Sequence, residues 1–96
     1  MNPGSTEYFC YVLHSQSYDR YYVGHCKDVK LRVIRHNKKL VASTRNYVPW
    51  TLVYYESYET KLTANRRELE IKKKKSRNYI KWVILNGPGT RVGDQK

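Results

Sequence analysis

The segment 19–37, DRYYVGHCKDVKLRVIRHN, carries an unusual group of chemically active side chains for a small domain. Tyr22 and Gly24 stand close together, and Arg32 follows ten positions after Tyr22. His36 lies one helical turn after Arg32, which places the two side chains on the same helix face. A phenol, a guanidinium and an imidazole can together bind an anion and move a proton. The segment therefore predicts a polar site rather than an ordinary core helix.

One carboxylate, Glu68, stands out in the segment KLTANRRELEIKKKK, residues 61–75. At 100° per residue, the apolar arc of a helix here is bounded by four residues: Leu62, Leu69, Ala64 and Ile71. Glu68 falls inside this arc, so we expect it to face the protein body. Glu70 falls on the opposite face, where Arg66 and Lys74 can form solvated salt bridges with it. A carboxylate that faces the body costs free energy unless an arginine, a metal ion or both pair with it.

The composition indicates a polyanionic partner. The chain has 96 residues, with 19 Lys and Arg against 8 Asp and Glu, and a formal net charge of +11. This length predicts one domain, and the charge favours nucleic acid or an anionic membrane surface. No apolar run approaches the ~18 residues of a membrane-spanning helix, and the N-terminus lacks the regions of a signal peptide. We therefore expect binding to nucleic acid and no membrane interaction.

The two cysteines, Cys10 and Cys26, do not have the spacing of metal ligands. Each lies in a strand-like segment beside bulky apolar residues, where a buried free thiol is expected. Free thiols are typical of a reducing compartment, so we expect a cytoplasmic protein.

The elements that position these residues follow the order β-β-α-β-α-α. Segments rich in aromatic and β-branched residues predict three strands: 8–15, 20–26 and 51–58. Capping residues followed by helical periodicity predict three helices: about 29–38 after Asp28, 61–75 after Thr60, and 77–85 after Ser76. We expect a small α/β domain at 8–86, built as a three-stranded antiparallel sheet flanked by helices. Residues 1–7 are predicted to be a flexible leader and residues 87–96 a flexible tail.

The first two strands are expected to form a hairpin. If its turn is centred on Gln16 and Ser17, Tyr11 lies opposite Tyr22. Side chains alternate along a strand, so Tyr22 and Gly24 share one face of the sheet. The helix that follows is expected to bury four apolar residues: Val29, Leu31, Val33 and Ile34. We expect the polar side of that helix to converge with the tyrosine face of the hairpin.

These residues, in this order, resemble the GIY-YIG nuclease domain. The matching parts are FCYVL at 9–13, YVG at 22–24, then Arg32, and finally Glu68 within RELEIK. The resemblance covers about 8–85 and extends to the small stand-alone bacterial proteins of the YhbQ and UPF0213 type.

The chain also departs from the family pattern. Phe9 and Cys10 replace the glycine and isoleucine of the first half-motif. The segment KKLVASTR at 38–45 replaces a glycine-rich loop, which bears on how substrate is held. Asn78 is the nearest counterpart of an asparagine that some members carry after the glutamate.

The resemblance implies hydrolysis of phosphodiester bonds in DNA. It assigns catalytic roles to five residues: Tyr11, Tyr22, Arg32, His36 and Glu68. Glu68 would hold a single divalent ion, Mg²⁺ or Mn²⁺, and Arg32 would clamp the phosphate oxygens. Tyr11 or Tyr22 would take a proton from the attacking water or orient it, with help from His36.

Other residues of the chain are candidate contacts to nucleic acid. They are Gly24, Lys27, Arg35, Arg45, Lys72, Lys75 and Arg77. Gly24 is included because a side chain there would crowd the metal or the phosphate. The cations would bind phosphates without reading sequence.

Each of these residues also has a purely structural interpretation. Tyr11 and Tyr22 can be a packed cross-strand pair, and Arg32 can be a solvated helix cation. His36 can be structural or can contact phosphate. Glu68 can be a buried structural partner of Arg32 that needs no metal. The run of lysines after Glu68 can be a solvated face.

Two functions therefore compete. The first is a metal-dependent endonuclease acting on DNA, and the resemblance is compatible with structure-selective cleavage in repair or recombination. The second is a nucleic-acid-binding module of the same fold with weak or no catalysis, acting on DNA or RNA. No separate DNA-binding domain is evident in the sequence, so we expect a protein partner or a dimer to supply substrate grip.

Overall fold

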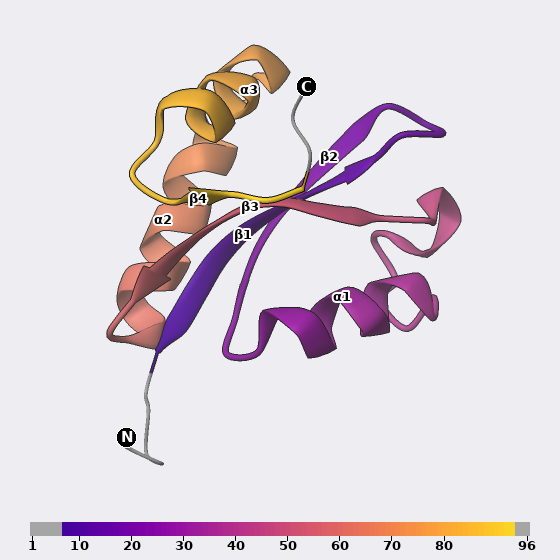
Figure 1. Ribbon diagram of the computed structural model, residues 1–96, viewed down its shortest axis with the longest axis horizontal. Helices are drawn as coiled ribbons and strands as arrows, with labels where there is room; N and C mark the ends of the chain where they lie inside the picture. The colour runs from indigo at the N-terminus through magenta and orange to yellow at the C-terminus, as the bar shows by residue number, and fades with distance from the viewer. Residues whose placement is uncertain (1–6, 94–96) are drawn as a thin grey trace.

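The computed structural model describes residues 7–93, and these form three layers (Figure 1). A central sheet separates helix α1 on one face from helices α2 and α3 on the other. The strands are β1 (Tyr8–Ser15), β2 (Arg20–Cys26), β3 (Thr51–Tyr58) and β4 (Thr90–Arg91). The helices are α1 (Val29–Asn37), the short 3-10 helix η1 (Arg45–Tyr47), α2 (Lys61–Lys73) and α3 (Arg77–Asn86). The α/β class is confirmed.

The sheet has four strands, in the order β2-β1-β3-β4, and all neighbours are antiparallel. The prediction of three strands was therefore wrong. Strand β4 lies within 87–96 and pairs Tyr54 with Arg91 and Tyr55 with Thr90. A two-residue strand has no alternation that a sequence pattern can reveal. Of the predicted leader only Glu7 is described, and residues 94–96 of the predicted tail also lie outside the described residues.

The hairpin has a different register from the one expected. Tyr11 pairs with Gly24, and Leu13 pairs with Tyr22. The turn occupies the four residues between Ser15 and Arg20 rather than being centred on Gln16 and Ser17. The longer turn shifts the pairing by two residues, which preserves the faces. Tyr11, Tyr22 and Gly24 therefore still lie on one side of the sheet.

The caps of the helices were predicted correctly, but the buried sides were not entirely. The side chains of Asp28, Thr60 and Ser76 accept hydrogen bonds at the starts of α1, α2 and α3. In α1, Leu31 and Ile34 are about half exposed, whereas His36 is fully buried. In α2 the inward residues are Ala64, Glu68 and Ile71, while Leu62 and Leu69 face solvent.

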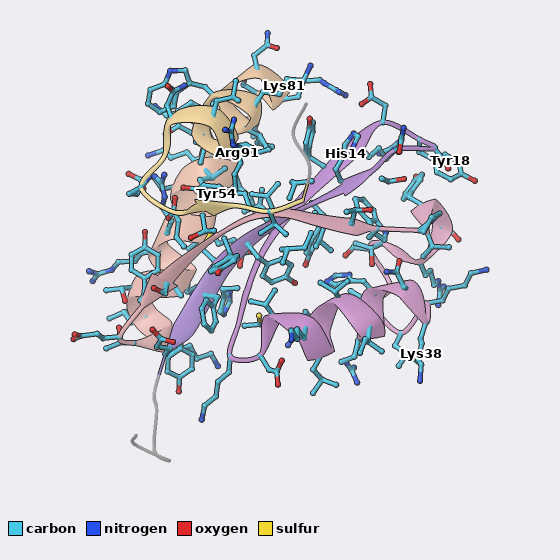
Figure 2. All side chains as sticks on the ribbon, in the orientation of Figure 1. His14, Tyr18, Lys38, Tyr54, Lys81 and Arg91 are labelled. Carbon is cyan, nitrogen blue, oxygen red and sulfur yellow. The ribbon has the colours of Figure 1, made fainter. Side chains whose placement is uncertain are left out.

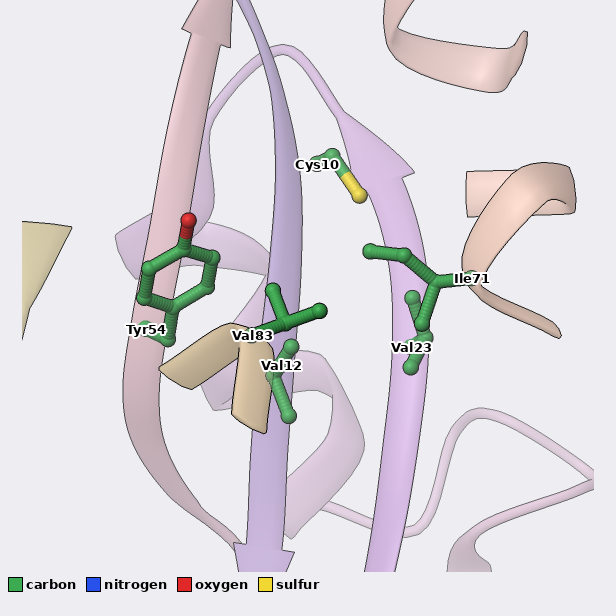
Figure 3. Packing of buried hydrophobic residues seen from close by; sticks show 6 residues of the cluster. All are labelled: Cys10, Val12, Val23, Tyr54, Ile71 and Val83. Carbon is green, nitrogen blue, oxygen red and sulfur yellow. The ribbon is translucent and has the colours of Figure 1, made fainter. Parts of the chain in front are cut away.

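Two apolar clusters fill the space on either side of the sheet. The cluster beneath α2 and α3 contains six buried residues (Figure 3): Cys10, Val12, Val23, Tyr54, Ile71 and Val83. The cluster beneath α1 contains four: Tyr11, Leu13, Cys26 and Trp50. Both cysteines are buried free thiols, as expected, and burial raises the pKa of the Cys26 thiol to about 11. No helix within residues 7–93 is long and apolar enough to span a bilayer.

The buried carboxylate of Glu56 connects strand β3 to helix α2, on the face of the sheet that carries the cluster beneath α2 and α3. Its oxygens accept hydrogen bonds from the hydroxyls of Tyr54 and Tyr58, each at 2.6 Å. Arg67 donates through Nε at 2.8 Å and through a terminal nitrogen at 3.1 Å. Burial acts to raise the pKa of Glu56, but the hydrogen bonds from Arg67 and the two tyrosines outweigh it, so the pKa lies below its usual value. The Tyr54 hydroxyl also accepts from the backbone N–H of Gly89, which holds the segment before β4.

We expect Glu56→Gln to lower the free energy of unfolding by about 3 kcal/mol, because it leaves the Arg67 guanidinium without its buried counter-charge. Urea denaturation monitored by circular dichroism measures this. Glu70→Gln is the matched control, since Glu70 is the exposed partner of the same arginine at 2.8 Å. It should cost less than ~1 kcal/mol. Equal effects of the two variants would contradict a stabilising role for the buried pair.

Candidate active site

A chain of hydrogen bonds connects Tyr11 to the loop after α1. The Thr44 hydroxyl donates to the carbonyl of Val41 at 3.4 Å, so its oxygen accepts from His36 Nδ1 at 2.7 Å. With its proton on Nδ1, His36 presents Nε2 as an acceptor for the Tyr11 hydroxyl at 2.9 Å. All three side chains are fully buried. The predicted site residues Tyr11 and His36 are therefore in direct contact.

This buried environment keeps both groups neutral near pH 7. Burial, reinforced by the positive charges of Arg32 and Arg35, lowers the pKa of His36 to about 4. Burial also raises the pKa of Tyr11 well above its usual value, and the Arg32 charge only partly opposes this. The arrangement suits a structural hydrogen-bond chain that fixes the position of the Tyr11 ring.

Gly24 is required by this ring. A Cβ atom at position 24 would lie 2.7 Å from the hydroxyl oxygen of Tyr11 and 2.9 Å from ring carbon Cε2 of Tyr22. Real Cβ atoms do not approach other atoms so closely, and the Tyr11 ring is held by His36. From the sequence, we expected this glycine to leave space for a metal or a phosphate. In the structure, it leaves space for the rings of Tyr11 and Tyr22.

Tyr22 lies between this buried chain and the solvent. Its ring centroid is 4.9 Å from that of His36 and 6.2 Å from that of Tyr11. On its other side the ammonium of Lys72 lies 5.4 Å from the ring centroid. The ring also lines an open hollow of about 560 Å³ between the β1–β2 turn and the end of α2. Tyr22 is therefore the phenol of the pair that solvent can reach.

Glu68, on helix α2, lies on the other face of the sheet, and its side chain contacts the edge strand β2. Its Oε1 accepts a hydrogen bond from Nδ1 of His25 at 2.5 Å, and its Oε2 accepts from the ammonium of Lys72 at 2.5 Å. The Glu68 side chain is 12% exposed, and that of Lys72 is 43% exposed. The structural interpretation in which Glu68 pairs with Arg32 is not found, since within the described residues its ion pairs are with His25 and Lys72. Glu70 likewise pairs with Arg67 rather than with Arg66 or Lys74.

Arg32 faces a second hollow on the other side of this edge. The hollow has a volume of about 390 Å³ and is lined by six residues: Tyr8, His25, Cys26, Lys27, Arg32 and Lys61. Three of the six side chains are permanent cations, so an anion such as a phosphate group fits this hollow. His25 lines it and also binds Glu68, which connects the guanidinium side to the carboxylate side.

The five predicted catalytic residues thus gather around strand β2 rather than within one cavity. β2 stands at the end of the sheet order, so residues from both of its faces meet at its free edge. Tyr11, Tyr22 and His36 form a packed group on the α1 side, and Lys72 links Tyr22 to Glu68 on the α2 side. This edge, carrying Tyr22, His25, Arg32, Glu68 and Lys72, is called the β2-edge site below.

The predicted nucleic-acid contacts divide into three groups. Lys27 lies in the Arg32 hollow, and Lys72, Lys75 and Arg77 line the Tyr22 hollow. Arg77 is also bound to Asp19, with 2.8 Å between its guanidinium and the carboxylate. Arg35, on α1, and Arg45, in η1, are exposed and line neither hollow. Asn78 is exposed at the start of α3.

Sequence reasoning missed His25 and Thr44. His25 directly follows the YVG segment and, by alternation, shares the sheet face of Val23, which packs beneath α2. A histidine on a strand face opposite an inward glutamate was a usable signal. Thr44 gave no comparable signal, because its bond to His36 depends on how the loop folds. That loop is tied down by Asn37, whose side chain bonds both backbone groups of Trp50 at 2.6 and 2.9 Å.

The residues at this edge fit a divalent cation. The Glu68 side chain is 12% exposed and has the Lys72 ammonium on one oxygen, and Lys72 itself lines an open hollow. The described residues contain no group of three or more His, Cys, Asp or Glu side chains that could hold a metal ion. A site here would therefore be open, with waters or substrate oxygens completing the coordination, as is usual for Mg²⁺.

The lowered pKa of His36 predicts a loss of stability in mild acid. The unfolded chain binds a proton on this histidine near pH 6.5, whereas the folded chain does so only near pH 4. The free energy of unfolding should therefore fall by roughly 2 kcal/mol between pH 7 and pH 5. Urea titrations at these two pH values measure it. His36→Gln should flatten this dependence, and His14→Gln should retain it; identical slopes for all three proteins would refute the assignment.

Comparison with known proteins connects this site to a family. Residues 7–81 match the GIY-YIG catalytic domain. A UPF0213 protein of Staphylococcus epidermidis is 43% identical over 63 residues, covering 65% of this chain and 77% of that protein. A UPF0213 protein of Staphylococcus aureus is 50% identical over 52 residues, covering 53% of this chain and 63% of that protein.

The fold has a solved counterpart. The solution NMR structure of a UPF0213 protein from Bacillus halodurans superimposes with a TM-score of 0.52 at 29% sequence identity. The match covers 85% of this chain and 87% of that one. The domain match spans β1 to α3, including β2, α1 and α2, which carry the β2-edge site. The chain belongs to the GIY-YIG family, whose members are in general endonucleases, and is similar to its UPF0213 proteins.

Proposed function

We propose that this protein is a divalent-metal-dependent endonuclease that hydrolyses phosphodiester bonds in DNA at the β2-edge site. The observation that carries the proposal is the placement of Arg32 and Glu68 on either side of His25. Arg32 lines the cationic hollow that His25 also lines, and Glu68 is hydrogen-bonded to His25. A phosphate in the hollow would have a guanidinium on one side and the carboxylate that binds the metal on the other.

Each residue of the site has a separate role in the proposed mechanism. Arg32 and Lys27 bind the non-bridging oxygens of the scissile phosphate and oppose the negative charge that grows in the transition state. Glu68 would hold the divalent ion, which would supply Lewis-acid stabilisation of the charge on the phosphate and on the departing oxygen. Tyr22, the less buried of the two tyrosines, orients the attacking water through its hydroxyl.

Tyr11 and His36 are positioning residues in this mechanism. They are fully buried and bonded to each other, so they hold the Tyr22 ring by packing rather than by touching substrate. Lys72 has two roles. It pairs with Glu68 before the metal binds, and its ammonium over the Tyr22 ring helps to hold that ring in place.

Substrate binding depends on charge rather than on contacts to the bases. Cations are spread over the surface, and Lys38 and Lys81 lie far apart on it (Figure 2). The net charge of +11 favours phosphate binding without sequence readout. We propose that a branched or otherwise distorted duplex is cut in preference to regular duplex, and that this activity serves repair or recombination.

A nicking assay on supercoiled plasmid and on branched DNA, with Mg²⁺ or Mn²⁺, tests the proposal. Glu68→Ala and Arg32→Ala should each lower the nicking rate by about 100-fold or more, because each removes charge stabilisation at the reacting phosphate. Glu70→Ala and Arg66→Ala, neighbours on α2 outside the site, should retain the wild-type rate.

Other outcomes of the nicking assay would contradict the proposal or favour the alternative function. If the wild type and both site variants cut equally, the site is wrongly assigned. If none cuts and all bind DNA with strong salt dependence, the alternative of a non-catalytic nucleic-acid-binding module is correct. Binding of RNA equal to that of DNA would point to the RNA form of that alternative.

The two tyrosines are distinguished by removing one hydroxyl at a time. Tyr22→Phe should lower the nicking rate by about 100-fold and leave stability unchanged, because only the contact to water is lost. Tyr11→Phe should lower the free energy of unfolding by about 1–3 kcal/mol, because it leaves His36 Nε2 buried without a donor. Single-turnover nicking and urea denaturation measure the two effects. A stable but inactive Tyr11→Phe protein would reverse the assignment.

A further inference from the structure

His25 and Glu68 bring two possible metal-binding atoms together, and the proposed mechanism gives His25 no contact with the metal ion. Nδ1 of His25 lies 2.5 Å from Oε1 of Glu68, and the two side chains come from different elements, β2 and α2. The His25 side chain is 25% exposed and lines the Arg32 hollow, so the pair is reachable from solvent.

We propose that His25 is the second protein ligand of the divalent ion at Glu68, and that this nitrogen makes the site select Mn²⁺ over Mg²⁺. The inference rests on the proposed metal site at Glu68 and adds a ligand and a preference to it. It involves this chain's own residues and holds whether or not the ion supports cleavage.

The distances permit this with little movement. Two adjacent ligands of an octahedral ion, each at about 2.1 Å, lie about 3 Å apart. The separation of Nδ1 and Oε1 is 2.5 Å, so an opening of about half an ångström would suffice for the ion to enter in place of the shared proton. Lys72, which is 43% exposed, would release Oε2 by rotating its flexible side chain toward the solvent.

The chemistry of the donors then sets the preference. Mg²⁺ is a hard cation that keeps water and oxygen ligands. Mn²⁺ also prefers oxygen and is the weakest binder of the first-row transition ions, but it accepts an imidazole nitrogen more readily than Mg²⁺ does. A site with one carboxylate oxygen and one imidazole nitrogen would therefore favour Mn²⁺. Its remaining positions would be filled by water or by phosphate oxygens from the Arg32 hollow.

Metal binding without DNA tests this directly, using the whole chain without a polyhistidine tag. Mn²⁺ is titrated into the protein and the free ion is followed by electron paramagnetic resonance. Magnetic coupling between the bound Mn²⁺ and a ligand nitrogen is measured by electron spin echo modulation. We expect nitrogen coupling in the wild type and tighter binding of Mn²⁺ than of Mg²⁺. His25→Ala and His25→Asn should remove the coupling, weaken Mn²⁺ binding by about 10-fold or more, and leave Mg²⁺ binding nearly unchanged.

The chain supplies a matched control. His14 also has a side chain that is 25% exposed and also pairs with a carboxylate, Asp19, at 3.2 Å. His14→Ala should bind Mn²⁺ as the wild type does. Circular dichroism confirms that each variant is folded, and the two His25 variants guard against a defect peculiar to either one.

The result separates this inference from the proposed function. If Mn²⁺ binding depends on Glu68 but not on His25, or shows no nitrogen coupling, the second ligand is refuted while the Glu68 site stands. If Glu68→Ala binds Mn²⁺ as the wild type does, the metal site at Glu68 is itself refuted, and this inference with it.

Discussion

The hydrogen bond between His25 and Glu68 is the contact on which the site depends, because it joins helix α2 to the edge strand β2. Because His25 and Arg32 line the same hollow, this bond connects the carboxylate to the guanidinium side of the edge. Lys72 completes the link by binding Glu68 and lying against Tyr22. An edge strand allows this arrangement because, within residues 7–93, no further strand pairs with its outer side. The position of the proposed active site at the margin of a small sheet follows from this geometry.

Two buried polar groups hold this edge in place from opposite faces. On the α1 side, the bonds from Tyr11 through His36 to Thr44 fix the phenol rings, and Gly24 provides the space they occupy. On the other side, Glu56 fastens α2 to the sheet through Arg67. Buried polar groups that are fully paired rigidify a core and specify one arrangement. A chain of 96 residues has a modest apolar core, so these networks contribute much of its specificity.

Most elements of the fold were predictable from the sequence, whereas the site residues stay a prediction. The strands and caps follow from local patterns, and the spacing from Tyr22 to Arg32 and Glu68 is characteristic of the family. The pairing of Glu68 was not predictable, because it depends on which side chain of β2 faces α2 across the sheet. The burial of His36 was not predictable either, because Leu31 and Ile34 on the same helix are more apolar and yet face solvent. Strand β4 escaped notice because two residues carry no periodic signal.

The central claim is that a DNA phosphate docks at the edge of β2, between Arg32 and Glu68. The most direct measurement is a two-dimensional NMR titration of backbone amides with a short DNA duplex, in the absence of divalent ions so that the DNA stays intact. The account predicts that the largest shift changes occur at residues 22–27, at Arg32 and at 68–72, with little change in β4. Changes confined to the exposed cations of α1 and α3, with the β2 edge unaffected, would contradict it.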